Sequence, residues 1–318
     1  MQEIKITEQE AGQRFDKLLG KYLNKAPKSF LYKMLRKKNI TLNGKKASGN
    51  EKLAKGDCVK LFLSDETIQK FSEAFSGYTN VSLDILYEDE DIILINKPVG
   101  MLSQKAARSD ESLVEHLISY LIQSHALTEE DLRTFRPSIC NRLDRNTSGI
   151  VAAGEGLQSL SQMFHDRTIG KYYLCLTAGI IEKPSRVEGW LFKDERTNKV
   201  EILFQERPGS ARIITEYRPI KSHDGVTLLE VHLITGKTHQ IRAHLASVGH
   251  PLIGDHKYGA SQINREYEQK YHLQSQLLHA ARLQFPVCTQ TLCSVSKKEF
   301  TAPLPKQFYR IAAEKGVL

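Results

Sequence analysis

Two segments near the start of the chain repeat apolar residues with the spacing of an α-helix. The first carries Phe15, Leu18, Leu19, Tyr22 and Leu23, and the second carries Phe30, Leu31, Met34 and Leu35 after the helix start signal Pro27-Lys28-Ser29. On the second segment Lys33, Arg36 and Lys37 share the face opposite the apolar residues, and Lys38 extends this cluster at its end. The pattern predicts two short amphipathic helices, the second with a basic face.

A β-hairpin is predicted directly after these helices. Asn43-Gly44 separates two short β-prone runs, and this dipeptide is a strong signal for a two-residue turn. Lys45 and Lys46 follow the turn and add positive charge, and residues 57–63 have the pattern of a closing strand. Residues 65–80 are polar with scattered aromatic residues and no sustained period, so we interpret them as a linker.

The pattern changes from residue 81 onward. A hairpin is predicted over 84–98, and a helix follows whose apolar positions are Leu113, Leu117, Leu121 and Ile122. Further β-prone runs lie near 172–178, 200–204, 212–220, 226–234 and 291–300, and the polar stretch 260–276 is interpreted as a surface insertion or helix. These elements predict an α+β fold with a mixed, largely antiparallel central sheet and flanking helices. We expect a small α/β domain at 1–64, the linker at 65–80 and a larger domain at 81–318.

Positive charge is concentrated in the first part of the chain. Residues 1–64 hold 15 Lys and Arg against 6 Asp and Glu, whereas the remainder carries a net charge of −1. A basic module joined to a nearly neutral body predicts that one part attracts a polyanion. RNA is favoured over a membrane surface, because no isolated helix with a broad apolar face accompanies the lysines. The expected RNA-binding residues of this part are Lys33, Arg36, Lys37, Lys38, Lys45 and Lys46.

Other features of the composition argue against several classes of protein. Nothing from Met1 onward resembles a charged and then apolar secretory leader, and no window approaches the ~18 consecutive apolar residues of a membrane helix. The five cysteines form no C-x-x-C pair, so we expect neither disulfides nor structural zinc. We therefore expect a cytoplasmic protein.

One carboxylate stands out in the larger domain. Asp144 lies in the polar run Asn141-Arg142-Leu143-Asp144-Arg145, which leads through Asn146-Thr147-Ser148-Gly149 into the apolar pair Ile150-Val151. A carboxylate in such a loop either ends a turn or caps a helix, or it is aimed at a substrate. On this run alone the turn is the favoured interpretation.

Several separated segments resemble the RluA-type pseudouridine synthases, in the same order along the chain. The string R-L-D-x-x-T-S-G around Asp144 matches the catalytic motif of that family. The other matches are Glu88-Asp89-Glu90-Asp91 with Asn96-Lys97-Pro98-Val99-Gly100, Lys171-Tyr172-Tyr173 with Gly179, Thr235-Gly236-Lys237-Thr238-His239-Gln240-Ile241-Arg242, Gly249-His250-Pro251-Leu252-Ile253-Gly254-Asp255 with Tyr258-Gly259, and the closing segments Leu278-His279-Ala280 and Phe300-Thr301-Ala302-Pro303-Leu304-Pro305. The resemblance covers about 81–306, and residues 12–64 resemble the alpha-L RNA-binding motif of a ribosomal small-subunit protein.

The resemblance implies a pseudouridine synthase fold and an RNA-modifying enzyme that isomerises uridine. Asp144 matches the essential aspartate, Tyr173 the active-site tyrosine, and Arg242 the arginine that keeps the aspartate ionised. Arg142 or Arg145 could supply that charge instead. Arg142, Arg145 and His239 are the expected RNA-binding residues of this part, and Arg145 or His239 would help to hold the target base out of the RNA. The reaction needs no redox change or external energy, so no cofactor and no metal are implied.

The position before R-L-D departs from the family, which usually has His where this chain has Asn141. Because that His is not the nucleophile, we expect activity to survive, while local orientation or specificity differs. An alpha-L motif before the catalytic domain resembles the enzymes that act on large-subunit ribosomal RNA, which we favour over transfer RNA as the partner. No membrane and no obligate protein partner are implied.

Several alternatives remain beside this interpretation. The same fold could serve a non-catalytic RNA-binding assembly factor, although a pure binder needs none of Asp144, Tyr173 and Arg242. An RNA glycosidase would release the base instead of isomerising it. A phosphate-binding loop at Gly236-Lys237-Thr238 is rejected because Val231 stands where the first glycine belongs. The spacing of His239, His244 and His250 does not suit a zinc site.

Overall fold

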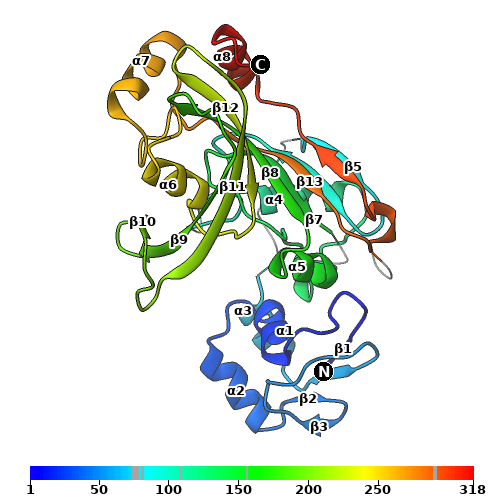
Figure 1. The fold of residues 1–318 in the computed structure, drawn as a ribbon. Coiled ribbons are helices and arrows are strands. Elements are labelled where there is room, and N and C mark those ends of the chain that lie inside the picture. The colour runs from blue at the N-terminus through cyan, green and yellow to red at the C-terminus, as the bar shows by residue number, and fades with distance from the viewer. Residues whose placement is uncertain (74–78, 80–81, 108, 155–156, 289–291) are drawn as a thin grey trace. The chain divides into compact units, whose positions relative to one another are not determined.

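The structure is a computed structural model, which describes residues 1–73, 79, 82–107, 109–154, 157–288 and 292–318 (Figure 1). Contacts divide the chain into two compact units. The first contains Met1–Ser82 and Val114–Ser138, and the second contains Leu83–Leu113 and Ile139–Leu318. None of the helices in the described ranges combines the length and the apolar character that crossing a membrane requires.

The predicted parts 1–64, 65–80 and 81–318 are contiguous, whereas the first unit also takes in residues 114–138. Helix α3 (Asp65–Phe71) occupies the start of the segment interpreted as a linker and buries Ile68 in the core of the first unit. The rest of that segment at 74–78 and 80, and the expected domain start at 81, lie outside the described residues. The functional assignment of the three parts stays a prediction.

The first unit combines helices with a small antiparallel sheet, as its pattern predicts. Its elements are α1 (Phe15–Tyr22), α2 (Lys28–Arg36), β1 (Gln2–Lys5), β2 (Ile40–Leu42), β3 (Lys45–Lys46) and β4 (Cys58–Leu61), with the strands in the order β1-β4-β2-β3. Asn43 and Gly44 join β2 to β3 with φ of 50° and 72°, which is the two-residue turn expected of this dipeptide. The helix and hairpin predictions are confirmed, and β1 was not predicted.

Residues 114–138 join this unit through side-chain contacts. Helix α4 (Leu113–Gln123), predicted from its apolar spacing, contributes to a small core formed by Ile118, Leu127, Leu132 and Phe135. The hydroxyl of Thr134 donates to the Glu10 carboxylate at 2.7 Å, and the Arg133 guanidinium lies 4.3 Å from the centre of the Tyr22 ring.

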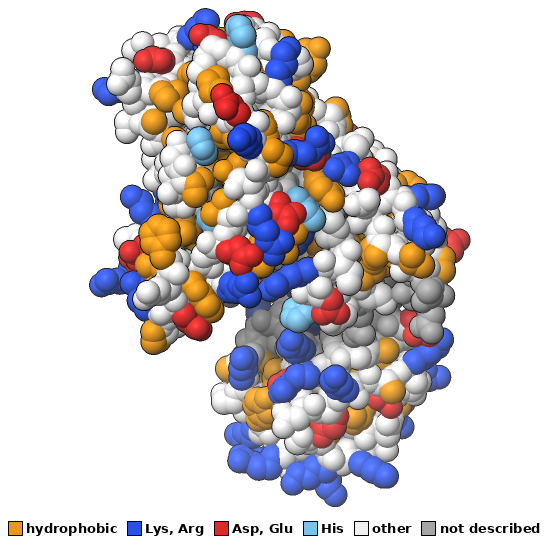
Figure 2. All heavy atoms as spheres, viewed as in Figure 1, with side chains coloured by type: hydrophobic (Ala, Val, Ile, Leu, Met, Phe, Trp, Pro, Cys, Tyr) orange, Lys and Arg blue, Asp and Glu red, His pale blue; other side chains and the backbone are white. Residues whose placement is uncertain are grey.

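One side of the first unit is strongly basic. The lysines and arginine predicted from the helical pattern and the hairpin are all exposed, namely Lys33, Arg36, Lys37, Lys38, Lys45 and Lys46. Figure 2 shows lysine and arginine side chains spread over the face of this unit with few acidic side chains among them. The apolar side of α2 is buried at Leu31, Met34 and Leu35, so the amphipathic prediction is confirmed.

The described part of the second unit is built on a ten-stranded sheet in the order β10-β9-β11-β12-β8-β13-β7-β6-β5, with β14 paired to β13. The strands are β5 (Ile85–Glu88), β6 (Ile93–Lys97), β7 (Ser148–Ala153), β8 (Gly170–Ala178), β9 (Ser185–Asp194), β10 (Lys199–Leu203), β11 (Ala211–His223), β12 (Val226–Leu233), β13 (Leu278–Gln284) and β14 (Glu299–Thr301). Only β13 and β7 pair in parallel. The mixed, largely antiparallel sheet of the prediction is therefore confirmed.

Helices cover different parts of this sheet (Figure 1). They are α5 (Leu157–His165), α6 (Gln240–Ser247), α7 (Ser261–Tyr271) and α8 (Lys306–Glu314). Helices α7 and α8 share a core with β8 and β12, whereas α6 packs through Ala243 on the curled strands β9, β10 and β11. The stretch 260–276 is thus a helix with a buried side.

One β-prone run was misjudged. The prediction of a strand over 291–300 is wrong, because only Glu299–Thr301 pairs and Cys293–Val295 forms a 3-10 turn. Lys297 lies between them with φ of 58°, which interrupts an extended backbone. Residue 291 lies outside the described residues.

Candidate active site

The loop that carries Asp144 is fastened to the strand that follows it. The Thr147 amide donates to the Asp144 carbonyl at 3.0 Å, which closes a tight turn. Asn141 bonds the backbone of β7 twice: its side-chain oxygen accepts from the Ala152 amide at 2.8 Å, and its amide donates to the Ile150 carbonyl at 3.1 Å. The residue that departs from the family pattern therefore holds the base of the loop.

Lys97 ties the same loop to the end of β6. Its side chain is fully buried, and Nζ donates to the carbonyls of Pro98 at 2.9 Å, Met101 at 2.8 Å and Arg145 at 3.1 Å. Burial lowers the pKa of Lys97 to about 7, against the opposing effect of the Asp144 charge. Because the Arg145 carbonyl follows Asp144 directly, this contact restrains the backbone that aims the carboxylate. Sequence reasoning did not identify this function of Lys97.

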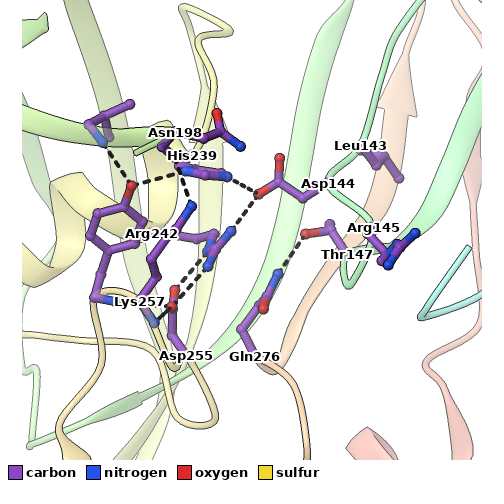
Figure 3. A network of polar contacts seen from close by, with 12 residues as sticks. Leu143, Asp144, Arg145, Thr147, Asn198, His239, Arg242, Asp255, Lys257 and Gln276 are labelled. Atoms are coloured by element: carbon purple, nitrogen blue, oxygen red, sulfur yellow. Dashed lines mark hydrogen bonds and ion pairs between the residues drawn. The ribbon is translucent and has the colours of Figure 1, made fainter. Parts of the chain in front are cut away.

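Arg242 projects from α6 and bridges two carboxylates (Figure 3). Its Nη1 donates to Oδ2 of Asp144 at 2.9 Å, while Nε and Nη2 donate to the two oxygens of Asp255 at 2.7 and 2.9 Å. Burial favours a lower pKa for Arg242, but the ion pairs with Asp255 and Asp144 outweigh it and raise the pKa. The structure thus places Arg242, and not the exposed Arg142 or Arg145, in the ion pair with Asp144.

Asp255 is the inner member of this network. Its side chain is 0% exposed, and Oδ1 also accepts from the backbone amides of Lys257 at 2.8 Å and Tyr258 at 3.1 Å. Burial favours a raised pKa for Asp255, but the bonds and charge of Arg242 outweigh it and lower the pKa. The sequence matched Asp255 to the family without giving it a role. Its only signal was its place in the segment Gly249–Asp255, because nothing in that segment reveals a partner on the preceding helix α6.

Helix α6 is held in place by the residue that opens it. The side chain of Gln240 donates to the Ile214 carbonyl and the Thr215 hydroxyl, both at 3.0 Å, and accepts from the Thr235 hydroxyl at 2.9 Å. His239 precedes it in the left-handed conformation with φ of 54°. These contacts fix the start of α6 against β11, so the position of Arg242 is set by the fold.

Tyr173 faces the same cavity as Asp144. It lies on β8 between Val231 of β12 and Ala280 of β13, and its side chain is buried. Burial, and secondarily the Asp144 charge, raises the pKa of Tyr173, so its hydroxyl stays protonated at neutral pH. The cavity has a volume of about 910 Å³ and is also lined by Arg242.

Further basic residues line this cavity. They include three of the predicted RNA contacts, Arg142, Arg145 and His239, together with Lys171, Lys193 and Lys237. The remaining predicted RNA contacts, on α2, at its end and in the hairpin, belong to the first unit. In the described ranges no three His, Cys, Asp or Glu side chains are grouped so that they could hold a metal ion.

Comparison with known proteins places this geometry in a family. A family model described as RNA pseudouridylate synthase matches residues 91–247. The chain is 30% identical to ribosomal large subunit pseudouridine synthase C of Vibrio vulnificus, covering 98% of this chain and 95% of that protein. It is 31% identical to the enzyme of the same name from Escherichia coli, covering 89% of this chain and 88% of that protein.

Solved structures support the fold. Human RNA pseudouridylate synthase domain containing 4 aligns with a TM-score of 0.58 at 22% identity, covering 73% of this chain and 92% of that chain. The corresponding human domain containing 1 aligns with a TM-score of 0.50 at 21% identity, covering 78% of this chain and 98% of that chain. Because the identity to the bacterial enzymes extends over nearly the whole chain, the protein belongs to the RluA-type family of RNA pseudouridine synthases.

Proposed function

We propose that this protein converts uridines of large-subunit ribosomal RNA to pseudouridine, with Asp144 as the catalytic carboxylate. The observation that carries this proposal is the 2.9 Å ion pair between Asp144 and Arg242 beside a cavity that Tyr173 also lines. The bacterial relatives named above are ribosomal large subunit synthases, which favours this RNA as the substrate. A cytoplasmic location follows from that substrate and is part of the proposal.

Asp144 would act on the ribose of the target nucleotide. The reaction breaks the bond between uracil N1 and the anomeric carbon, rotates the base, and forms a bond from C5 to the same carbon. The carboxylate either attacks the anomeric carbon or takes a ribose proton, and both routes need an anionic oxygen against the sugar. Oδ2 is engaged by Arg242, so Oδ1 is the atom available for the substrate.

Tyr173 would lie against the uracil ring and assist the last proton transfer. A flat apolar ring at the cavity wall suits stacking on a base. The proton on C5 must leave after the new bond forms and finally resides on N1. Because the raised pKa keeps the Tyr173 hydroxyl protonated, this group acts as a hydrogen-bonding relay and not as a phenolate base.

RNA binding would use both units. The basic residues of the first unit would contact phosphates, which are the main source of affinity for nucleic acids. They are Lys33, Arg36, Lys37, Lys38, Lys45 and Lys46. At the cavity, Arg142, Arg145 and His239 would hold the flipped nucleotide, whose unstacking costs a few kcal/mol.

The proposal is tested by carbodiimide mapping of pseudouridine in total RNA from cells that lack the gene. These cells are complemented with wild type, with Asp144→Asn, or with Asp166→Asn, which alters an exposed carboxylate on the same unit. We expect marks in large-subunit RNA to return with wild type and Asp166→Asn only. If pseudouridine returned in transfer RNA instead, the substrate would be transfer RNA and not ribosomal RNA. If Asp144→Asn restored pseudouridine, the catalytic role of Asp144 would be wrong.

Purified protein distinguishes the remaining alternatives. Isomerisation leaves the mass of the RNA unchanged, whereas a glycosidase would lower it by the loss of uracil. Tight RNA binding without either change would indicate the non-catalytic assembly factor. Asp144→Asn should bind RNA as wild type does, because its carboxylate contributes chemistry and not phosphate attraction.

A further inference from the structure

His239 lies between Asp144 and Tyr258, and each of its ring nitrogens faces one of them. Figure 3 shows the His239 ring directed at the Asp144 carboxylate. Nδ1 is 2.9 Å from the Tyr258 hydroxyl, and Nε2 is 3.8 Å from Oδ2 of Asp144. The imidazole is nearly buried, with 9% of its side chain exposed. An imidazole with a hydrogen-bond partner at one nitrogen and a carboxylate facing the other favours one tautomer, and the neighbouring groups indicate which one it is.

The Tyr258 hydroxyl determines the state of Nδ1. Its oxygen accepts from the backbone amide of Val200 at 3.0 Å. The hydroxyl proton is then available to His239. If Nδ1 accepts it, Nε2 carries the ring proton. In this arrangement Val200, Tyr258 and His239 form a chain of donors that ends with an N–H directed at Asp144.

The opposite tautomer is unfavourable in this geometry. With the proton on Nδ1, the Nε2 lone pair would face the Asp144 carboxylate, and two electron-rich atoms would repel each other. The Tyr258 hydroxyl would also have to turn its proton away from the ring. The Nε2–H tautomer satisfies both contacts at once.

The ring is also neutral. Burial lowers the pKa of His239, and the charges of Arg242 and Lys257 act in the same direction, while Asp144 and Asp255 oppose them. Protonation at Nδ1 would further require the Tyr258 hydroxyl to stop donating. His239 therefore presents a dipole and not a positive charge, so it orients the Asp144 carboxylate without neutralising it.

We propose that His239, fixed by Tyr258 as the Nε2–H tautomer, is a positioning residue that directs Oδ1 of Asp144 at the substrate. Arg242 and His239 both face Oδ2 of Asp144, and Figure 3 shows that neither contact involves the other oxygen of Asp144. The two atoms are 3.8 Å apart in this structure, and the proposed role requires this distance to shorten to a hydrogen bond when the substrate fills the site. The inference deepens the proposed function, since it depends on Asp144 being the catalytic carboxylate.

The backbone at His239 offers a competing explanation that the test must separate. His239 adopts φ of 54°, a left-handed conformation in which Asn is well tolerated. If the residue mattered only for this turn, Asn would replace it well. His272 has the same φ of 54° but an exposed side chain in the same unit, so it serves as a matched control for the backbone effect.

The tautomer is measured without RNA on the full-length protein labelled with ¹⁵N-histidine. Long-range ¹H–¹⁵N spectra distinguish Nε2–H from Nδ1–H, and the His239 signals are assigned by their loss in His239→Gln. We expect Nε2–H in wild type, and in Tyr258→Phe a higher pKa or a mixture of tautomers. An Nδ1–H tautomer in wild type, or unchanged spectra in Tyr258→Phe, would overturn the inference.

Activity is measured by single-turnover kinetics with saturating enzyme. Gln places an amide N–H near the position of Nε2, whereas the amide of Asn reaches only about as far as Nδ1. We expect His239→Asn to be about 100-fold slower than wild type at saturating enzyme, and His239→Gln to recover most of this loss. The same two substitutions at His272 should leave the rate unchanged.

Equal rates for His239→Gln and His239→Asn would overturn the positioning role. Failure of the inference and failure of the proposed function are distinguishable. An Nδ1–H tautomer with an inactive Asp144→Asn protein rejects only the inference. A fully active Asp144→Asn protein rejects the proposed catalytic role and the positioning role with it, whichever tautomer is found.

Discussion

Replacing Arg242 with Met should destabilise the second unit through Asp255. Methionine has a similar length and keeps the apolar contacts of the side chain, but it removes three N–H donors and the charge between two carboxylates. Asp144 can turn toward solvent, since 27% of its side chain is exposed. Asp255 cannot, because it is 0% exposed. The substitution therefore leaves one buried carboxylate without its counterion.

The expected cost is set by that unpaired charge. Removing one partner of a buried ion pair typically costs about 3–5 kcal/mol. Asp255→Asn provides the matched variant, since its Oδ1 can still accept from the amides of Lys257 and Tyr258 while the charge is gone. In Arg242→Met/Asp255→Asn no buried unpaired charge remains, so the double variant should lose less stability than the sum of the single losses, by about 2 kcal/mol.

The pH dependence gives an independent check of the cause. In wild type the pKa of Asp255 is lowered, so its contribution to stability is present above the unfolded value of about 3.9 and is lost as the pH falls below it. Without Arg242, burial raises the pKa of Asp255, and the charge opposes folding until the group is protonated. The difference between wild type and Arg242→Met should therefore shrink as the pH falls from 7 toward 4.

The assay is urea unfolding followed by tryptophan fluorescence at pH 7, 5.5 and 4.5. Trp190 is the only tryptophan in the chain and lies in β9, so it reports on the second unit alone. The reasoning would be refuted if Arg242→Met lowered the unfolding free energy by less than about 1 kcal/mol, or if the losses of the two single variants were strictly additive in the double variant. It would also be refuted if the difference in unfolding free energy between wild type and Arg242→Met did not change with pH.

Two other predictions test the fold and the RNA-binding surface. Gly149→Ala should lower the unfolding free energy by about 3 kcal/mol, because its Cβ would lie 2.2 Å from the Ala280 carbonyl oxygen at a φ of 110°; an unchanged urea midpoint would contradict this. Replacing Lys33, Arg36 and Lys37 with Ala should weaken RNA binding and reduce the slope of log affinity against log salt by about 2–3, measured by filter binding. An unchanged slope would show that these side chains do not contact phosphates.

Local patterns were sufficient to predict the elements of the first unit. The apolar residues of α1 and α2 recur at helical spacing, and the Asn43-Gly44 turn requires positive φ at both positions, so each element follows from short-range preferences. Strand β1 was not predicted, because Gln2–Lys5 becomes a strand only by pairing with β4, whose residues follow much later in the chain.

Central strands of the second unit were harder to predict for the same reason. Strand β13 has the sequence Leu278-His279-Ala280-Ala281-Arg282-Leu283-Gln284, which is rich in helix formers and lacks clear alternation. It is nevertheless a strand because β8 and β7 flank it, and its pairing overrides local preference. Such an element is specified by its neighbours in space, which a single sequence does not reveal.

In the candidate site, too, some features could be predicted from the sequence and others depend on the fold. Asp144, Tyr173 and Arg242 were singled out by their motifs, and the structure brings all three to one cavity. The contacts made by Asp255 and Tyr258 were missed, because each depends on how the loop after α6 folds back onto that helix. The order of motifs along a sequence identifies candidate residues, but the contacts that orient them arise from the fold.

The arrangement of the three charged groups explains why two carboxylates share one guanidinium. The exposed fraction of the side chain rises from 0% for Asp255 through 10% for Arg242 to 27% for Asp144. Arg242 neutralises the buried Asp255, so the net negative charge of the three groups lies on Asp144, the most exposed of them. Asp255 takes two of the N–H groups of Arg242 and fixes its plane, which leaves Nη1 alone for Asp144. One hydrogen bond restrains a carboxylate less than two, so Asp144 retains an oxygen for the cavity. The Arg242–Asp255 pair therefore contributes to stability, and the Arg242–Asp144 pair orients the proposed catalytic carboxylate. Arg242→Met should lower stability through the first pair and activity through the second.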